Sequence, residues 1–137
     1  MPLILRNDII TLEEIQSKRK EFFCFGDNVQ RWGMGGMARI CRGEPNIIGI
    51  VTKWAPDRAP NSYFDDATIL AQVSLIEEDL IRVALLSIQE AVHYPIGIGS
   101  GLAEMPTRAP LTWAYLQTRI NQIKEFSDII ERKKAVL

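Results

Sequence analysis

Two glycine clusters have the residue types and spacing that could hold a ligand. The first, Gly33, Gly35 and Gly36, comes shortly after an apolar run at 22–25. The second is the stretch 97–102, Gly-Ile-Gly-Ser-Gly-Leu. Main-chain N–H groups of such loops can bind an anion, because the missing side chains let a ligand approach the backbone. Glycines alone are equally consistent with tight turns that need a positive φ.

The first cluster does not match the two common phosphate-binding signatures. No Gly-Lys-Ser or Gly-Lys-Thr follows Gly36, which excludes a Walker loop. The third glycine is also misplaced for the dinucleotide pattern Gly-x-Gly-x-x-Gly.

The segments that must position these loops are strands and helices in alternation. Apolar runs bounded by turn formers predict strands. Helix starts are predicted by the capping-box spacing Thr11-x-x-Glu14 and by Pro110. The alternation indicates an α/β fold with an at least partly parallel sheet. The predicted strands cover 2–5, 22–25, 47–51 and 91–96, and the predicted helices cover 12–18, 37–41, 66–89 and a segment from 110.

The two glycine clusters and Lys53 each follow a predicted strand. Ligands of open α/β sheets bind beyond the carboxyl ends of the strands, so we expect the loops and Lys53 to converge on one edge. Two glycine loops and a lysine at one edge favour a pyrophosphate-sized site over two unrelated turns.

Several other polar residues are expected to have no chemical role. Glu77, Glu78, Asp79 and Arg82 occupy the polar face of the longest predicted helix and are predicted to be solvated. His93 lies within a predicted strand and is expected to be packed or hydrogen-bonded rather than catalytic.

Composition limits the classes of function. Lys and Arg total 16 and Asp and Glu total 17, giving a net charge of -1. This balance provides no electrostatic footprint for duplex nucleic acid or an anionic membrane. Two cysteines and one histidine make neither a disulfide framework nor a zinc ligand set. The 137 residues show no signal-peptide pattern and no apolar run of membrane-spanning length, which predicts one cytoplasmic domain over 1-137 without metal or cofactor.

Three stretches, taken in order, resemble the macrodomains, a family that binds ADP-ribose and related nucleotides. Residues 7–11, Asn-Asp-Ile-Ile-Thr, look like the family's Gly-Asp-Ile-Thr element. Residues 25–38 look like its strand-end Asn and the glycine loop around the distal ribose, and residues 95–102 look like its phosphate-embracing loop. The resemblance spans residues 3 to about 125 and implies a single three-layer α/β/α domain with a mixed, partly parallel sheet.

The resemblance also implies a role for each matching position. Asp8 would accept a hydrogen bond from the adenine amino group, and the N–H of Asp8 or Ile9 would contact a ring nitrogen. Asn28 would bind the distal ribose. Asp8 is equally consistent with a helix or turn cap, and Asn28 with a left-handed turn residue. The loops would contribute Gly33, Gly35, Gly36, Gly97, Ile98, Gly99, Ser100, Gly101 and Leu102.

The nearer resemblance is to the branch that removes ADP-ribose from acidic side chains or DNA bases, which includes antitoxin macrodomains. Lys53 is similar to that branch's strand-end catalytic lysine, and Glu104 is the candidate acid or base. The branch places an Asp after Gly-x-Gly-Leu, but this chain has Ala103 there. Lys53 is also consistent with a surface or phosphate-pairing lysine. The sequence resembles more closely still a group of compact macro-like proteins, common in phages and bacteria, that carry the pattern Phe-Gly-(Asp/Ser)-Asn.

Two functions follow as expectations. The first is handling of ADP-ribose, either by hydrolysis from modified protein or nucleic acid or by capture of a free signalling nucleotide. The second is a non-catalytic interaction or assembly module that keeps the fold but not the ligand. An open cleft would favour the first function. A cleft plugged by Trp32, Met34 or Met105 would favour the second.

Overall fold

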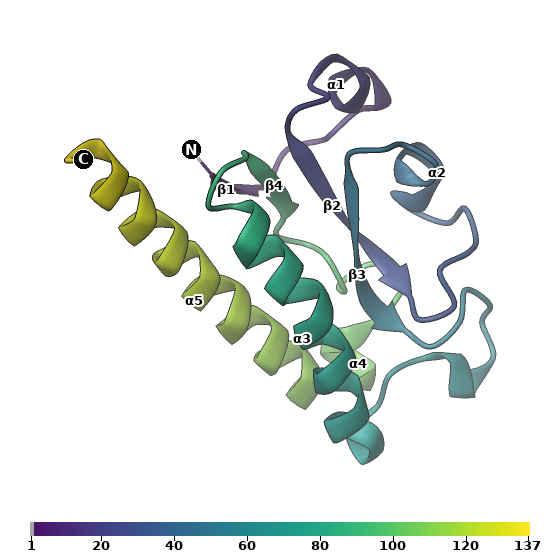
Figure 1. The fold of residues 1–137 in the computed structure, drawn as a ribbon. Helices are drawn as coiled ribbons and strands as arrows, with labels where there is room; N and C mark the ends of the chain where they lie inside the picture. The colour runs from purple at the N-terminus through teal and green to yellow at the C-terminus, as the bar shows by residue number, and fades with distance from the viewer. Residues whose placement is uncertain (1) are drawn as a thin grey trace.

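The computed structural model describes residues 2–137, and a four-stranded sheet lies at its centre (Figure 1). The order across the sheet is β1-β4-β2-β3, and every pairing between these strands is parallel. The prediction of a mixed sheet was therefore wrong, because helical crossovers between successive strands bring each strand back in the same direction. The strands are β1 Leu3–Arg6, β2 Phe22–Asn28, β3 Ile47–Lys53 and β4 Val92–Pro95.

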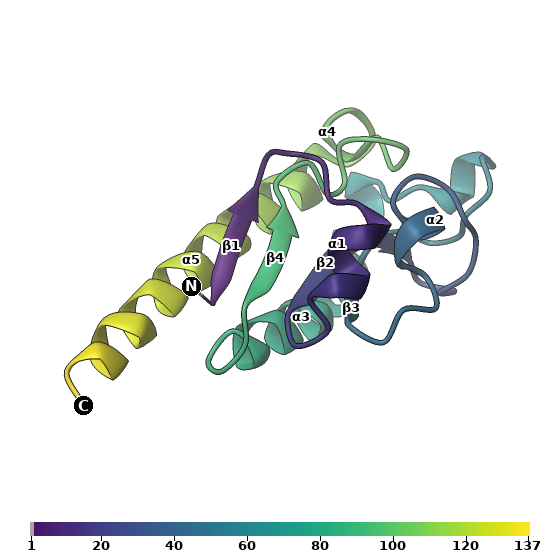
Figure 2. The same cartoon turned by 90° about the horizontal axis from the view of Figure 1, so that it is seen from above.

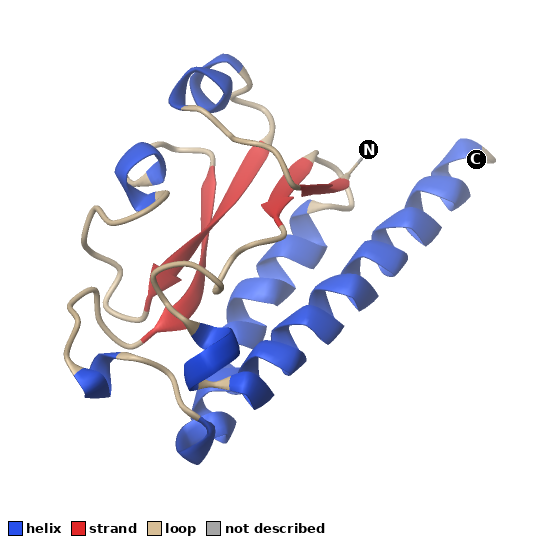
Figure 3. Ribbon diagram, turned by 180° about the vertical axis from the view of Figure 1, so that it is seen from behind, coloured by secondary structure: helices blue, strands red, loops and turns tan. Residues whose placement is uncertain are grey.

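Helices cover both faces of this sheet. The two long helices α3 and α5 run side by side over one face, whereas α1 and α2 lie on the other (Figures 1 and 2). Figure 3 shows that loops gather at the carboxyl ends of the strands. Among residues 2–137, no helix combines the length and the apolar character needed to cross a membrane. The helices are α1 Leu12–Ser17, α2 Ala38–Cys41, α3 Ile69–Leu86, α4 Met105–Arg108 and α5 Pro110–Ala135.

Strand β2 divides the core into two layers of buried side chains. Phe23 and Phe25 point to the α1 and α2 side, where they pack with Ile15. Cys24 points to the α3 and α5 side, where it packs in the same cluster as Ile76. Because successive strand residues face opposite sides, one strand serves both cores, and the three-layer α/β/α arrangement follows.

Local signals located most helix starts. Thr11 caps α1, because its hydroxyl accepts the N–H of Glu14 at 3.1 Å. The last helix begins at Pro110 as predicted. The helix predicted over 66–89 is shorter, since a 3-10 turn at Asp66–Thr68 precedes α3. The sequence did not predict α4, which contains Pro106 and lies in a stretch interpreted as a loop.

Asp79 was wrongly predicted to be solvated, because its side chain is fully buried against the outer edge of β3. Its carboxylate accepts the main-chain N–H of Val51 at 2.9 Å and the guanidinium of Arg31 at 2.7 Å. Arg31 in turn donates to the carbonyl oxygen of Gly49 at 3.1 Å. The two side chains therefore supply the donor and the acceptor that a neighbouring strand would supply.

The opposite edge of the sheet has a similar arrangement. Both main-chain polar groups of Leu3 in β1 are bound by side chains of α5. The Ser127 hydroxyl accepts the N–H at 3.0 Å, and the Lys124 ammonium donates to the carbonyl at 2.9 Å. Each edge strand is thus tied to a helix through its own backbone.

Candidate functional site

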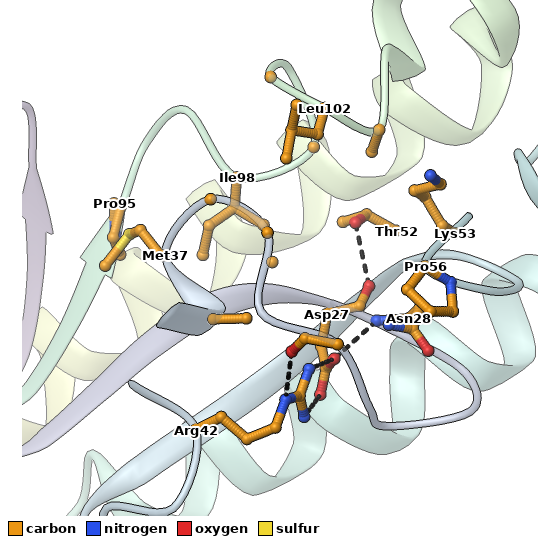
Figure 4. A pocket seen from close by; sticks show the side chains of 18 of the residues that line it. Asp27, Asn28, Met37, Arg42, Thr52, Lys53, Pro56, Pro95, Ile98 and Leu102 are labelled. Atoms are coloured by element: carbon orange, nitrogen blue, oxygen red, sulfur yellow. Dashed lines mark hydrogen bonds and ion pairs between the residues drawn. The ribbon is translucent and has the colours of Figure 1, made fainter. Parts of the chain in front are cut away.

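A cavity of about 400 Å³ lies beyond the carboxyl ends of β2, β3 and β4 (Figure 4). Both glycine loops contribute to its wall, and Lys53 lies at its border with the loop after β3. The expected convergence on one edge of the sheet is therefore present. The predicted residues that line it are Asn28, Gly33, Gly35, Gly36, Lys53, Gly97, Ile98, Gly99, Gly101 and Leu102.

Four predicted site residues lie outside this lining. Asp8 is exposed and forms a double hydrogen bond with Arg6, which holds the pKa of its carboxyl below the usual value. Ile9 is also exposed. The Ser100 hydroxyl donates to the carbonyl oxygen of Gly97, and Glu104 lines an adjoining hollow. The geometry therefore gives no support to a role of Asp8 or Ile9 in this cavity.

Asn28 is placed by an irregularity at the end of β2. The register between β2 and β3 shifts between Asp27 and Asn28, and such bulges re-aim side chains. The Asn28 side-chain nitrogen donates to the carbonyl oxygen of Trp32 at 2.7 Å, but its side-chain oxygen is buried without a partner among residues 2–137. A buried polar atom of this kind is costly unless a ligand or water satisfies it.

The second glycine loop presents unused main-chain donors. Within residues 2–137, the N–H groups of Gly97, Gly99 and Gly101 donate to no protein atom. Gly26 forms part of the facing wall, and a Cβ there would lie 3.9 Å from the nitrogen of Gly99. Free N–H groups in a glycine-rich loop form an anion-binding concavity.

A buried ion pair fixes the first glycine loop. The Asp27 carboxylate accepts the guanidinium of Arg42 at 2.7 Å, and the same guanidinium donates to the carbonyl oxygen of Gly33 at 2.7 Å (Figure 4). Arg42 thus joins the end of α2 to both the strand and the loop. Gly49 must lack a side chain, because a Cβ would lie 2.7 Å from the Asp27 carboxylate.

Lys53 is buried at the border between the cavity and the loop after β3. Its ammonium donates to the carbonyl oxygen of Asp57 at 2.8 Å and lies 4.2 Å from the centre of the Tyr63 ring. Burial lowers the pKa of Lys53, whereas the charges of Asp57 and Glu104 oppose that shift. The environment therefore favours the neutral amine more than water does.

Glu104 reaches Lys53 only across a second hollow of about 340 Å³ that both residues line. Its backbone is left-handed, with φ at 53°, and its carboxylate lies 3.5 Å from Arg108. Ala103, at the position of the branch's Asp, lines the main cavity without any polar side-chain atom. Hence no carboxylate occupies the position that the resemblance assigns to the acid or base.

The side chains that could have plugged the cleft leave it open. Trp32 lines the cavity but remains largely exposed, and its indole N–H donates to Gln30. Met34 is exposed, and Met105 is buried in the core beneath the second loop.

Sequence reasoning missed several residues of the wall. Asp27 was not predicted as a site residue, although the turn signal Gly26-Asp27-Asn28 marks the position. Arg42 carries no local signal, because it reaches the loop from a neighbouring helix. The missed lining residues are Gly26, Asp27, Met37, Ala38, Arg42, Thr52, Pro56, Pro95 and Ala103. Within residues 2–137, no group of three or more His, Cys, Asp or Glu side chains could hold a metal ion.

Comparison with known protein families gives one match. A model described as a family of unknown function, DUF7831, matches residues 5–119. The chain belongs to this family. The matched range contains both glycine loops and Lys53, so the cavity lies within the part that defines the family. No curated protein and no solved structure matches the chain.

Proposed function

We propose that the chain binds ADP-ribose or a related nucleotide in the cavity between its two glycine loops. One observation carries the proposal: the second loop presents free N–H groups to an open cavity that Asn28 and the first glycine loop also line. A diphosphate can accept from those N–H groups. The largely apolar remainder of the wall suits a base and the faces of the sugars.

Removal of ADP-ribose from a modified protein or nucleic acid is the finer part of the proposal, and Lys53 would be its nucleophile. The lowered pKa of Lys53 favours this role. The absence of a carboxylate at Ala103 and the outward pairing of Glu104 with Arg108 oppose it. Positioned acid–base help is typically worth about two to four orders of magnitude in rate. We therefore propose binding with weak or no hydrolysis.

Calorimetry with ADP-ribose, AMP, NAD and cyclic ADP-ribose isomers tests the binding. We expect at least one of these nucleotides to bind saturably, and Gly26→Val to weaken that binding by about tenfold or more, since its side chain would take up ligand volume. A Cβ at residue 26 meets no atom closer than 3.6 Å, and circular dichroism checks that the variant with the two further methyl groups of valine is folded. Unchanged affinity of a folded variant would show that the ligand binds outside this cavity. Failure of all four nucleotides to bind would refute the proposal.

A release assay tests the chemistry separately. ADP-ribosylated protein and DNA are incubated with the wild type, Lys53→Ala and Glu104→Gln, and released ADP-ribose is measured. We expect little turnover by any of the three. Robust wild-type turnover that Lys53→Ala abolishes would show that the chain is a hydrolase.

A further inference from the structure

The second hollow adjoins the nucleotide cavity and has a different character. It is lined by Gly35, Lys53, Pro56, Arg58, Tyr63, Leu102 and Glu104. Four of these residues, Gly35, Lys53, Pro56 and Leu102, also line the main cavity. The two spaces therefore meet at the end of β3.

The charges in this hollow are not balanced. Lys53 is 8% exposed, and no carboxylate oxygen of residues 2–137 lies within 4 Å of its ammonium. Arg58 is exposed and forms no ion pair with any of residues 2–137. Glu104 is already shared with Arg108. The Asp57 carboxylate accepts the Ala59 N–H and the Ser62 hydroxyl.

We propose that the second hollow is an anion subsite for a compact oxyanion of the phosphate class, held between the Lys53 ammonium and the Arg58 guanidinium. A buried cation without a counter-ion is costly, and the anion supplies the missing charge. The guanidinium fork matches two oxygens of such a group. The Tyr63 ring holds Lys53 in place, because the Lys53 ammonium lies 4.2 Å from the ring centre; the Arg108 guanidinium lies 3.7 Å from the same ring.

This subsite goes beyond nucleotide binding and stands if the main cavity holds another ligand. The oxyanion has two possible sources, free phosphate or a phosphate group of the nucleotide in the main cavity. Either source gives the same local chemistry, and the arms of the experiment distinguish them.

The test follows main-chain amide NMR signals of the full chain during titration with inorganic phosphate at pH 7 and constant ionic strength. We expect saturable shifts at Arg58, Tyr63 and Glu104, and a several-fold weaker affinity in Arg58→Gln. Arg132→Gln removes a matched exposed cation from the last turn of α5 and should have no effect. Lys53→Met, which keeps the aliphatic stem, should weaken binding further.

A second arm saturates the protein with ADP-ribose before phosphate is added. Shifts that persist show that the hollow takes free phosphate beside a bound nucleotide, and shifts that disappear show that the bound nucleotide itself occupies the hollow. Shifts confined to residues 97–101, or equal losses in Arg58→Gln and Arg132→Gln, would overturn the subsite. Failure of ADP-ribose to bind would refute only the nucleotide proposal and leave the phosphate result standing.

Discussion

At the scale of the residue, two glycines of the cavity have different physical reasons to be glycine. Gly26 has ordinary space around it, so its missing side chain keeps the cavity open. Gly99 has φ at +93°, and a Cβ there would lie 2.7 Å from the sulfur of Met105. Gly99 therefore shapes the loop and its packing on the core, and only Gly26 offers a clean test of binding.

The same comparison predicts how larger side chains in the second glycine loop change the stability of the fold. Gly99→Val should lower the free energy of unfolding by about 2–4 kcal/mol, because it adds overpacking to left-handed strain. Gly101→Val is the matched control in the same loop, since a Cβ there has no neighbour within 4 Å and the φ is not positive. Urea unfolding measures both variants, and equal stability of the two would contradict this explanation.

The pH dependence of sulfate binding and of ADP-ribose release distinguishes an anion-binding Lys53 from a nucleophilic one. Burial lowers the pKa of Lys53, so its ammonium is lost at a lower pH than that of an ordinary lysine. Sulfate, which stays a dianion, should therefore bind more weakly as pH rises from about 7 to about 10. The other charged groups around Lys53 are Asp57, Arg58, Glu104 and Arg108, and hydrogen bonds from Ser62 and Ala59 hold the pKa of Asp57 below its usual value.

Calorimetry of sulfate binding at several pH values measures this profile. Lys53→Met should remove the pH-dependent step. A nucleophilic Lys53 would instead give a release of ADP-ribose that rises over the same pH range, because only the neutral amine attacks. A flat profile in the wild type would contradict the anion-binding role.

At the scale of the element, Arg31 and Asp79 take the place of a fifth strand beside β3. Arg31 adopts φ at 60° and reaches the Gly49 carbonyl, while Asp79 receives the Val51 N–H. This pair closes the edge and ties α3 to the loop that leads into the first glycine cluster.

Loss of the Asp79 hydrogen bonds to Arg31 and Val51 should lower the free energy of unfolding. Asp79→Ala leaves the Val51 N–H and the Arg31 guanidinium without their acceptor, and we expect a loss of about 3 kcal/mol in the free energy of unfolding. Asp79→Asn keeps an acceptor for the N–H and should cost less. Denaturant unfolding measures both, and a neutral Asp79→Ala would show that the pair contributes nothing.

The pH dependence of this tie has a definite sign. Burial raises the pKa of Asp79 above 3.8, although the Val51 N–H and Arg31 oppose the shift. The native state therefore holds this proton more tightly than the unfolded chain does. The contribution of Asp79 is fullest below the unfolded pKa and is lost as pH rises through the folded pKa. The stability difference between wild type and Asp79→Asn should thus shrink as the pH rises above about 4, and a growing difference would contradict this direction.

The elements also show what local sequence can predict. Thr11, Pro110 and the apolar runs predicted starts and types correctly, because caps, fixed φ angles and periodicity act over a few residues. Strand direction, the burial of Asp79 and the reach of Arg42 depend on contacts between distant segments. The two loops were predicted to converge because the carboxyl ends of parallel strands share one edge.

His93 illustrates a site that sequence described well. It was expected to be packed or hydrogen-bonded, and it stacks on Phe23 with ring centres 4.4 Å apart. Its Nδ1 lies 2.8 Å from Arg6 and its Nε2 lies 2.7 Å from Glu21. Arginine can only donate, so Nδ1 accepts and Nε2 carries the proton that binds Glu21. A histidine with both nitrogens engaged has neither free for chemistry.

At the scale of the whole molecule, nucleotide binding should stabilise every element at once. A ligand present at a hundred times its dissociation constant adds about 2.7 kcal/mol to the free energy of unfolding. For a chain of this size that corresponds to a rise of about 5–10 °C in Tm. Differential scanning fluorimetry with the four nucleotides measures it, and a folded Gly26→Val protein that binds tenfold more weakly should show about half of that rise at the same ligand concentration.

The bound backbones of the two edge strands also bear on aggregation. A sheet grows by adding a strand wherever a row of free N–H and carbonyl groups is offered. Here Leu3, Gly49 and Val51 already have their partners in α5, in α3 and in the turn after β2. A strand of another protein, or of a growing fibril, could not form main-chain hydrogen bonds at these positions, because the groups already have partners. Loss of Asp79 would reopen one of them, so its first visible consequence in a concentrated solution would be precipitation.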